Sequence, residues 1–219
     1  MAVFSEGKER MARINEEKYP ILKANELVNP VLFVVDMVNG FVKEGALADP
    51  AIGACSQPIA RLIEALHSRV IFVNDTHEED AAEFQSFPVH CLRGSREAQV
   101  VDELLPYADE VLEKNCISAA AAPGFAKILE SLPDKCDLIV TGCCTDLCVL
   151  QLALPLKSWI SQNNRKGCRV IVPINCVETY EIPDVHDAKF WNEAALANMA
   201  ANGIRAVSKI VLDARESHG

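Results

Sequence analysis

The sequence of 219 residues predicts an α/β fold, namely a three-layer αβα sandwich around a central, mostly parallel six-stranded sheet. Short apolar runs recur along the chain, and segments with helical spacing of apolar residues separate them. Half of the residues are hydrophobic, which suffices for a full core without disulfide support. Strands that alternate with helices in this way form parallel sheets covered by helices on both faces, with right-handed crossovers.

Residues 1–28 are expected to be an N-terminal helical extension that lies on the main domain. Charges of both signs are balanced in this segment, and apolar residues recur at loose helical spacing, at Met11, Ile14, Ile21 and Leu22. Residues 29–219 are expected to form one domain, because no Gly/Ser-rich linker, low-complexity tract or internal repeat divides them.

The first strand is expected at Val31–Asp36, which is apolar on both faces like a central strand of a parallel sheet. Asp36 stands at the carboxyl end of this strand, where open α/β sheets bind their ligands. Aspartate also often caps a turn or a helix, and the residue alone does not decide between the two roles.

The remaining elements follow from the same periodicities. Helical spacing predicts helices at about 50–68, 98–105, 123–132, 147–160 and 183–202. Apolar runs predict strands at 70–74, 110–113, 138–140, 169–173 and 206–212. Pro123 stands at a helix start and Gly203 just beyond a helix end, where these residues are favoured. Pro155 falls inside its helix and is expected to kink or shorten it.

Four side chains with metal-binding chemistry follow the second strand. Asp75 and His77 stand directly beyond it, and Glu83 and His90 lie farther along the same loop. Carboxylates and imidazoles are hard and borderline ligands for divalent metals. Two of the five histidines fall in this one loop, so we favour a metal site over a chance grouping, although an Asp-x-His motif alone carries little weight.

The stretch DLIVTGCCTDLCVL, residues 137–150, predicts a strand, a sharp turn and the start of a helix near Leu147. Cys148 then lies in the first helical turn. Backbone N–H groups and the helix dipole stabilise an anion there, so we expect this thiol to lose its proton more readily than a free cysteine. For an isolated cysteine, a buried apolar role at a strand–helix junction is the alternative.

The composition excludes several classes of function. The formal net charge is −10 and the basic residues are scattered, which argues against binding to nucleic acid or to an anionic membrane. No apolar run is long enough to span a bilayer, and charged residues occupy the N-terminus, so we expect a soluble, cytoplasmic protein. The nine cysteines are odd in number and irregularly spaced, which favours reduced thiols over disulfides. The sequence contains no CxxC pair, which argues against a structural zinc site built from cysteines.

Taken together, these residues resemble the isochorismatase-like cysteine hydrolases, over about residues 31–211. Asp36 ends the first strand, Lys114 follows the third, and Cys148 lies in a GxxTDxCV turn after the fourth, as in the Asp–Lys–Cys triad of that superfamily. By itself, such a lysine is usually solvated surface. The resemblance is closest to nicotinamidases, whose metal motif is an Asp-x-His and a later His in a context like FPVHCLRGS.

The resemblance implies that the domain at 29–219 is an amidohydrolase that converts nicotinamide to nicotinate and ammonia through a thioester. It implies that Asp36 is the general base, that Lys114 favours the thiolate and that Cys148 is the nucleophile. The backbone N–H groups of Cys144 and Cys148 are then the oxyanion hole, and a non-proline cis peptide joins Cys143 to Cys144.

The resemblance further implies a divalent metal, Zn²⁺ first with Mn²⁺ and Fe²⁺ as alternatives, that orients the pyridine ring. Its ligands are expected to be Asp75, His77, Glu83 and His90, where Glu83 stands seven residues before the last histidine as in some nicotinamidases. Phe41 and Phe87 are the candidates for ring contacts, and both are equally compatible with a role in the core.

Two departures concern the substrate. Thr76 stands where many nicotinamidases carry an aromatic residue, and Ile117 stands where some carry a tyrosine. Either change is expected to widen the pocket or to lessen stacking on the substrate ring. Another small amide such as pyrazinamide, an N-carbamoyl compound, or isochorismate therefore stays open, as does a non-catalytic metal-binding protein on the same fold. The partners expected are a small-molecule amide and further copies of the chain in a homo-oligomer.

Overall fold

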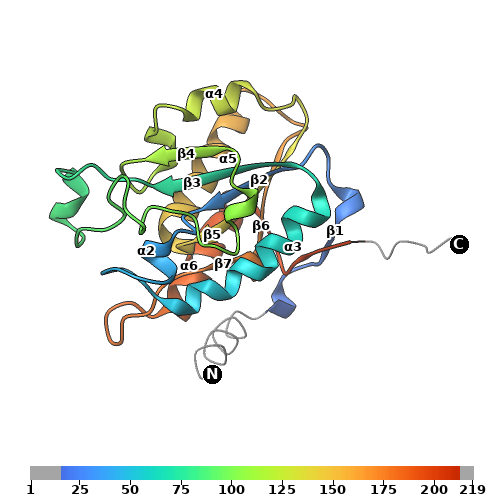
Figure 1. Cartoon of the computed structure of the whole chain (residues 1–219). Coiled ribbons are helices and arrows are strands. Elements are labelled where there is room, and N and C mark those ends of the chain that lie inside the picture. The colour runs from blue at the N-terminus through green and yellow to red at the C-terminus, as the bar shows by residue number, and fades with distance from the viewer. Residues whose placement is uncertain (1–15, 213–219) are drawn as a thin grey trace, which may run out of the picture.

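A seven-stranded sheet between two layers of helices forms the centre of the computed structural model, which describes residues 16–212 (Figure 1). Every strand pair in the sheet is parallel, and the order is β4-β3-β2-β5-β6-β8 with β7 beside β5. The strands are β2 Val31–Val35, β3 Arg69–Asp75, β4 Val111–Lys114, β5 Asp137–Cys143, β6 Arg169–Pro173, β7 Val177–Glu178 and β8 Arg205–Val207.

Helices cover both faces of the sheet, which confirms the three-layer αβα architecture, but the sheet has seven strands and not the six expected, because the short β7 also pairs with β5. One face packs against α4 Phe125–Glu130, α5 Leu150–Gln162 and α6 Ala188–Ala201. The other face packs against α2 Asn39–Val42 and α3 Ser56–Leu66, and Figure 1 shows α3 crossing in front of the sheet. The two cores share the strands because side chains alternate between the faces of a strand.

Short 3-10 and π turns connect these elements. The 3-10 turns are Glu16–Lys18, Ala24–Glu26, Pro50–Cys55, Ala82–Gln85, Leu105–Tyr107, Ala119–Ala121 and Ile174–Cys176, and a π turn spans Thr145–Val149. The helix expected at 50–68 is thus divided into a 3-10 turn and α3. The helix expected at 183–202 begins only at Ala188, because the Asp187 side chain caps it by accepting from the Phe190 N–H.

The sixth strand expected at 206–212 is divided into β8 and β9 Ile210–Val211. β9 leaves the main sheet and pairs with β1 Leu22–Lys23. The Leu22 N–H donates to the Lys209 carbonyl and the Ser208 N–H to the Pro20 carbonyl, and these hydrogen bonds hold β9 beside β1. The local sequence pattern does not encode this pairing.

The prediction of a helix at 98–105 is wrong. Residues 98–104 form turns and bends that lead into the 3-10 turn at Leu105–Tyr107. Asn39 explains the difference, because its side-chain amide donates to the carbonyls of Arg96 and Gln99, and a helix at 98–105 would use the Gln99 carbonyl internally. The Val101 N–H likewise donates to the carbonyl of Met37. Contacts with a distant segment therefore replace helical hydrogen bonds.

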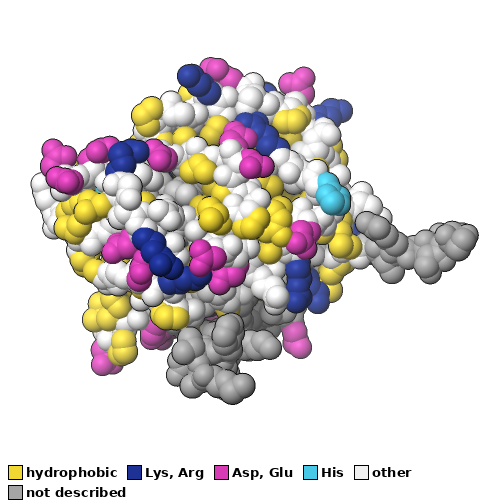
Figure 2. Space-filling model, in the orientation of Figure 1, with side chains coloured by type: hydrophobic (Ala, Val, Ile, Leu, Met, Phe, Trp, Pro, Cys, Tyr) yellow, Lys and Arg dark blue, Asp and Glu magenta, His cyan; other side chains and the backbone are white. Residues whose placement is uncertain are grey.

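The N-terminal helical extension expected at 1–28 lies largely outside the described residues. Its described part, 16–28, forms 3-10 turns on either side of β1, and no α-helix runs through those residues. Among the helices of residues 16–212, none is long and apolar enough to cross a membrane. On the face shown in Figure 2, Lys and Arg side chains are dispersed among Asp and Glu.

Candidate active site

The carboxyl ends of four adjacent strands bring the predicted reactive residues together. Asp36 follows β2, Asp75 ends β3 and Lys114 ends β4, while Cys148 follows β5 by one turn. Asp75 and Lys114 are direct partners in the β3–β4 register. All four side chains are buried.

Gly142 allows the approach of β5 to β2 at this edge. It has a φ of +105°, and a Cβ atom built at this position would lie 2.0 Å from the Val35 carbonyl oxygen. A side chain is therefore excluded both by the backbone conformation and by contact. The glycine lets the chain turn sharply toward Cys148.

The Lys114 ammonium is the centre of this group. Its Nζ lies 2.9 Å from Asp36 Oδ2, contacts the Asp75 carboxylate and lies 3.7 Å from Cys148 Sγ. Asp36 Oδ1 accepts the backbone N–H of Asp75 at 2.7 Å, which orients the carboxylate. One oxygen each of Asp36 and Asp75 and the Cys148 sulfur lie within 4.8 Å of one another. The carboxylate, ammonium and thiol are thus within reach of proton transfer.

Burial and the neighbouring Asp75 charge raise the pKa of Asp36 to about 6, although Lys114 acts in the opposite direction. Burial alone would lower the pKa of Lys114, but the surrounding carboxylates outweigh it and keep the ammonium charged. Burial would also raise the pKa of Asp75, yet Lys114 and the two histidines hold it below its usual value. The pKa of Asp36 suits a group that takes up and returns a proton near neutral pH.

The expectation of an acidic Cys148 thiol is wrong in direction. Burial raises the pKa of Cys148 well above its ordinary value, and the Asp36 and Asp75 charges add to this effect. The attraction of Lys114 does not offset it. The resting side chain is therefore a thiol, and a base has to take its proton during attack.

The turn before Cys148 contains a cis peptide between Cys143 and Cys144. The π turn that begins at Thr145 follows, and the Leu147 and Val149 N–H groups both donate to the Cys144 carbonyl. The regular helix α5 starts only at Leu150, three residues later than predicted, and contains Pro155. Cys144 and Cys148 both line the cavity described below.

Asp75, His77, Glu83 and His90 form a second cluster, in which one ligand atom of each lies within 4.8 Å of the others. The two histidine Nε2 atoms are 3.1 Å apart. Asp75 oxygens lie 3.6 Å from His77 Nε2 and 3.8 Å from His90 Nε2, and Glu83 Oε1 lies 3.9 Å from both. Two imidazoles and two carboxylates are a donor set typical of Zn²⁺ and related cations.

The hydrogen bonds of the two rings support a cation between them. His77 Nδ1 lies 3.0 Å from Asn115 Oδ1, which also accepts the Glu78 N–H, and His90 Nδ1 lies 2.8 Å from the Pro88 carbonyl oxygen. Both Nδ1 atoms thus carry a hydrogen, and the Nε2 lone pairs of neutral rings face each other. Such a pair needs a proton or a metal cation between the nitrogens, so these residues fit a divalent metal.

A cavity of about 400 Å³ joins the two clusters, because Asp75, Glu83, His90 and Cys148 all line it. Phe41 and Phe87 line it as well, so both predicted ring contacts lie at this site. Phe41 also belongs to the core and is only 7% exposed, so its place in the core is shown, whereas its contact with a substrate ring stays a prediction.

Several residues at the site carried no sequence prediction. Phe84 packs edge-on against His77 and His90, with ring centroids 5.3 and 5.7 Å apart. Asn115 directly follows Lys114, and this position next to a predicted site residue could have marked it as a candidate. Tyr180 lines the cavity from a distant segment, and no local pattern marks it.

A family model described as the Isochorismatase domain matches residues 30–208. No curated protein sequence matches the chain significantly.

Solved structures of hydrolases have the same fold. An N-carbamoylsarcosine amidase from Thermoplasma acidophilum is 27% identical, covers 82% of this chain and 96% of its own, and has a TM-score of 0.63. A nicotinamidase from Bacillus subtilis is 25% identical over 83% of this chain and 100% of its own, with a TM-score of 0.65. Yeast nicotinamidase is 18% identical over 82% of this chain and 100% of its own, with a TM-score of 0.68, and supports the fold alone.

Proposed function

Because the chain belongs to the isochorismatase family of hydrolases, we propose that it is an amidohydrolase that converts nicotinamide to nicotinate and ammonia. The contact of one ammonium, Lys114, with both the Asp36 carboxylate and the Cys148 thiol carries this proposal. The arrangement supplies a nucleophile, a base and an electrostatic partner beside the cavity that Cys148 lines.

In the first half of the reaction, Cys148 Sγ attacks the carboxamide carbon while Asp36 takes the thiol proton. Lys114 stabilises the negative charge that develops on sulfur, and the N–H groups of Cys144 and Cys148 hold the oxyanion. Asp36 then passes its proton to the departing nitrogen. Ammonia leaves and a thioester on Cys148 remains.

In the second half, Asp36 removes a proton from water, which attacks the thioester carbonyl. The C–S bond breaks, the proton returns from Asp36 to the Cys148 sulfur, and the acid product leaves and loses its proton to solvent as nicotinate. The high pKa of the Cys148 thiol and the pKa of about 6 for Asp36 are consistent with a proton that shuttles between the two groups.

The metal cluster and the cavity walls support a pyridine ring as the bound group. Asp75, His77, Glu83 and His90 would hold the divalent cation, which we propose to be Zn²⁺ with Mn²⁺ and Fe²⁺ as alternatives. Such a cation supplies a Lewis-acid contact for a ring nitrogen. Phe41 and Phe87 supply apolar contacts for the ring.

The charges of the cavity favour an uncharged amide. Among the described residues that line it, none is Lys or Arg, whereas Asp49, Asp75, Glu83 and Glu181 are carboxylates. A substrate with its own carboxylate, such as isochorismate or an N-carbamoyl amino acid, therefore finds no Lys or Arg side chain among these lining residues to pair with. An N-carbamoyl compound is nevertheless the second candidate, because the amidase from Thermoplasma acidophilum is 27% identical. With nicotinamide as substrate, the enzyme would act in cytoplasmic NAD salvage, and the homo-oligomer stays a prediction.

Ammonia release from nicotinamide, pyrazinamide and N-carbamoylsarcosine, each with and without a chelator, tests the proposal. We expect release from nicotinamide and a loss of that activity after metal removal. Release from the carbamoyl compound alone, unaffected by the chelator, would overturn the assignment and favour the second candidate.

A further inference from the structure

The turn that carries the nucleophile is tied to a distant segment through Asp146. This residue lies midway between Cys144 and Cys148 in the sequence, and both of its carboxylate oxygens have partners. Oδ1 accepts the Thr179 hydroxyl at 2.5 Å, and Oδ2 lies 2.9 Å from His186 Nε2. Any movement of these partners therefore acts on the turn between the two proposed oxyanion donors.

His186 is fixed on every side. Its Nδ1 lies 2.9 Å from the Tyr180 carbonyl oxygen, so Nδ1 and Nε2 both face acceptors. Its ring stacks on Tyr180, with centroids 3.9 Å apart and planes 15° apart. It also stacks on Trp191, with centroids 5.4 Å apart and planes 10° apart. A ring held by two hydrogen bonds and two aromatic faces has one orientation.

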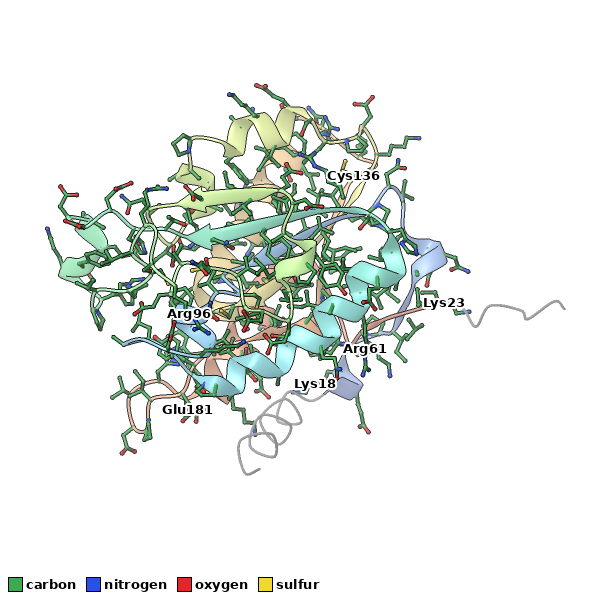
Figure 3. The ribbon with its side chains drawn as sticks, in the orientation of Figure 1. Lys18, Lys23, Arg61, Arg96, Cys136 and Glu181 are labelled. Carbon is green, nitrogen blue, oxygen red and sulfur yellow. The ribbon has the colours of Figure 1, made fainter. Side chains whose placement is uncertain are left out.

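The segment that His186 holds is a wall of the cavity. Tyr180, Glu181 and Ile182 line the cavity together with Phe41 and Phe87, and His186 and Ile182 exchange two backbone hydrogen bonds of 2.8 and 3.0 Å. The Glu181 N–H donates to Asp49 Oδ2 at 3.0 Å, and Figure 3 labels Glu181 at the lower left end of α3 in that view. The wall is thus anchored at Asp49 and, through His186, at the nucleophile turn.

We propose that His186 is a positioning residue, which aligns the cavity wall at Tyr180–Ile182 with the nucleophile turn through its bond to Asp146. A substrate amide held by the wall then meets Cys148 and the oxyanion donors at a fixed distance. Displacements of about 1 Å at a reacting centre cost up to about 100-fold in rate. The inference rests on the proposed function for its substrate, but the tie between wall and thiol is testable without one.

Three substitutions separate the interactions of the imidazole. His186→Gln keeps a donor near the Nε2 position toward Asp146, His186→Asn keeps one near Nδ1 toward the Tyr180 carbonyl, and His186→Phe keeps only the stacked ring. For nicotinamide hydrolysis we expect kcat to fall about tenfold or more in the Phe and Asn variants. The Gln variant should retain most of the wild-type kcat, and Val185→Ala, on the exposed tip of the same loop, is the matched control.

Alkylation of Cys148 by iodoacetamide, followed by mass spectrometry of its peptide, gives a readout that needs no substrate. We expect slower alkylation in His186→Phe than in wild type, with Cys116 as the internal reference. If the wild type releases no ammonia from nicotinamide, the proposed function fails and this rate alone decides the inference.

Two results would overturn the positioning role. In the first, the Phe variant melts at a lower temperature but has wild-type kcat and wild-type Cys148 alkylation, measured well below its melting temperature. In the second, all three variants lose the same activity, which means that the bond to Asp146 has no special part.

Discussion

The Nζ atom of Lys114 lies 2.9 Å from Asp36 Oδ2, and neither side chain has any exposed surface. The same ammonium also contacts the Asp75 carboxylate. One cation thus lies between the proposed base and a proposed metal ligand, which links the two clusters electrostatically. A charge at such a position affects both stability and chemistry.

Replacing Lys114 with Met should impair both properties. Two carboxylates remain buried without their cation, so the free energy of unfolding should fall by about 3–5 kcal/mol. The kcat for amide hydrolysis should fall by about 100- to 1,000-fold, because the charge on sulfur loses its partner. Chemical denaturation and ammonia release measure the two effects. The control is Lys127→Met, on the exposed face of α4, which should change neither the free energy of unfolding nor kcat. Wild-type turnover in the Lys114 variant would contradict the role assigned to Lys114.

Cys148→Ala should abolish ammonia release while the protein still folds, because the substitution removes one sulfur atom from a buried position. The matched control is Cys144→Ala, which removes a neighbouring buried thiol but keeps the backbone N–H that is proposed to hold the oxyanion. We expect this control to stay within about tenfold of wild type. Ammonia assays and thermal unfolding of both variants distinguish them. Equal losses in the two variants would mean that Cys148 is not the nucleophile.

His90→Asn should lower the amount of divalent metal that copurifies with the protein, since it removes an inward-facing Nε2 atom. Added Zn²⁺ at about 100 times its dissociation constant should stabilise the wild type by about 2.7 kcal/mol and the variant far less. Metal analysis and thermal melts with and without chelator measure this. His67→Asn, at the end of α3, is the control. If the His90 variant keeps as much metal as the wild type, the cluster is not the metal site.

Gly142→Ala should be among the most damaging small substitutions in the sheet. The new methyl group would lie 2.0 Å from the Val35 carbonyl oxygen, so β2 and β5 have to separate. We expect a loss of about 3 kcal/mol or more in the free energy of unfolding. Gly94→Ala isolates the backbone effect, because Gly94 also has positive φ but nothing within 4 Å of its Cβ position. Similar losses at the two glycines would show that the contact is unimportant.

Local patterns predicted most of the sheet correctly. The runs that became β2, β3, β5 and β6 are largely apolar because helices cover both faces of the sheet, whereas β4 at the sheet edge alternates between exposed and buried residues. The prediction failed where a distant segment supplies hydrogen bonds, as Asn39 does for residues 96–99 and Pro20 for Ser208. Neither partner can be found from the helical or strand spacing of the segment itself.

By itself, the sequence determined which reactive side chains stand at strand ends: Asp36, Asp75, Lys114 and Cys148 follow runs whose apolar character is a local property. Only the tertiary structure decided the order β4-β3-β2-β5, which brings those ends together, and the place of His186 beside Asp146. It also decided the direction of the Cys148 pKa. The pKa depends first on burial, which raises it, and then on the charges that other strands bring close: Lys114 lowers it, and Asp36 and Asp75 raise it.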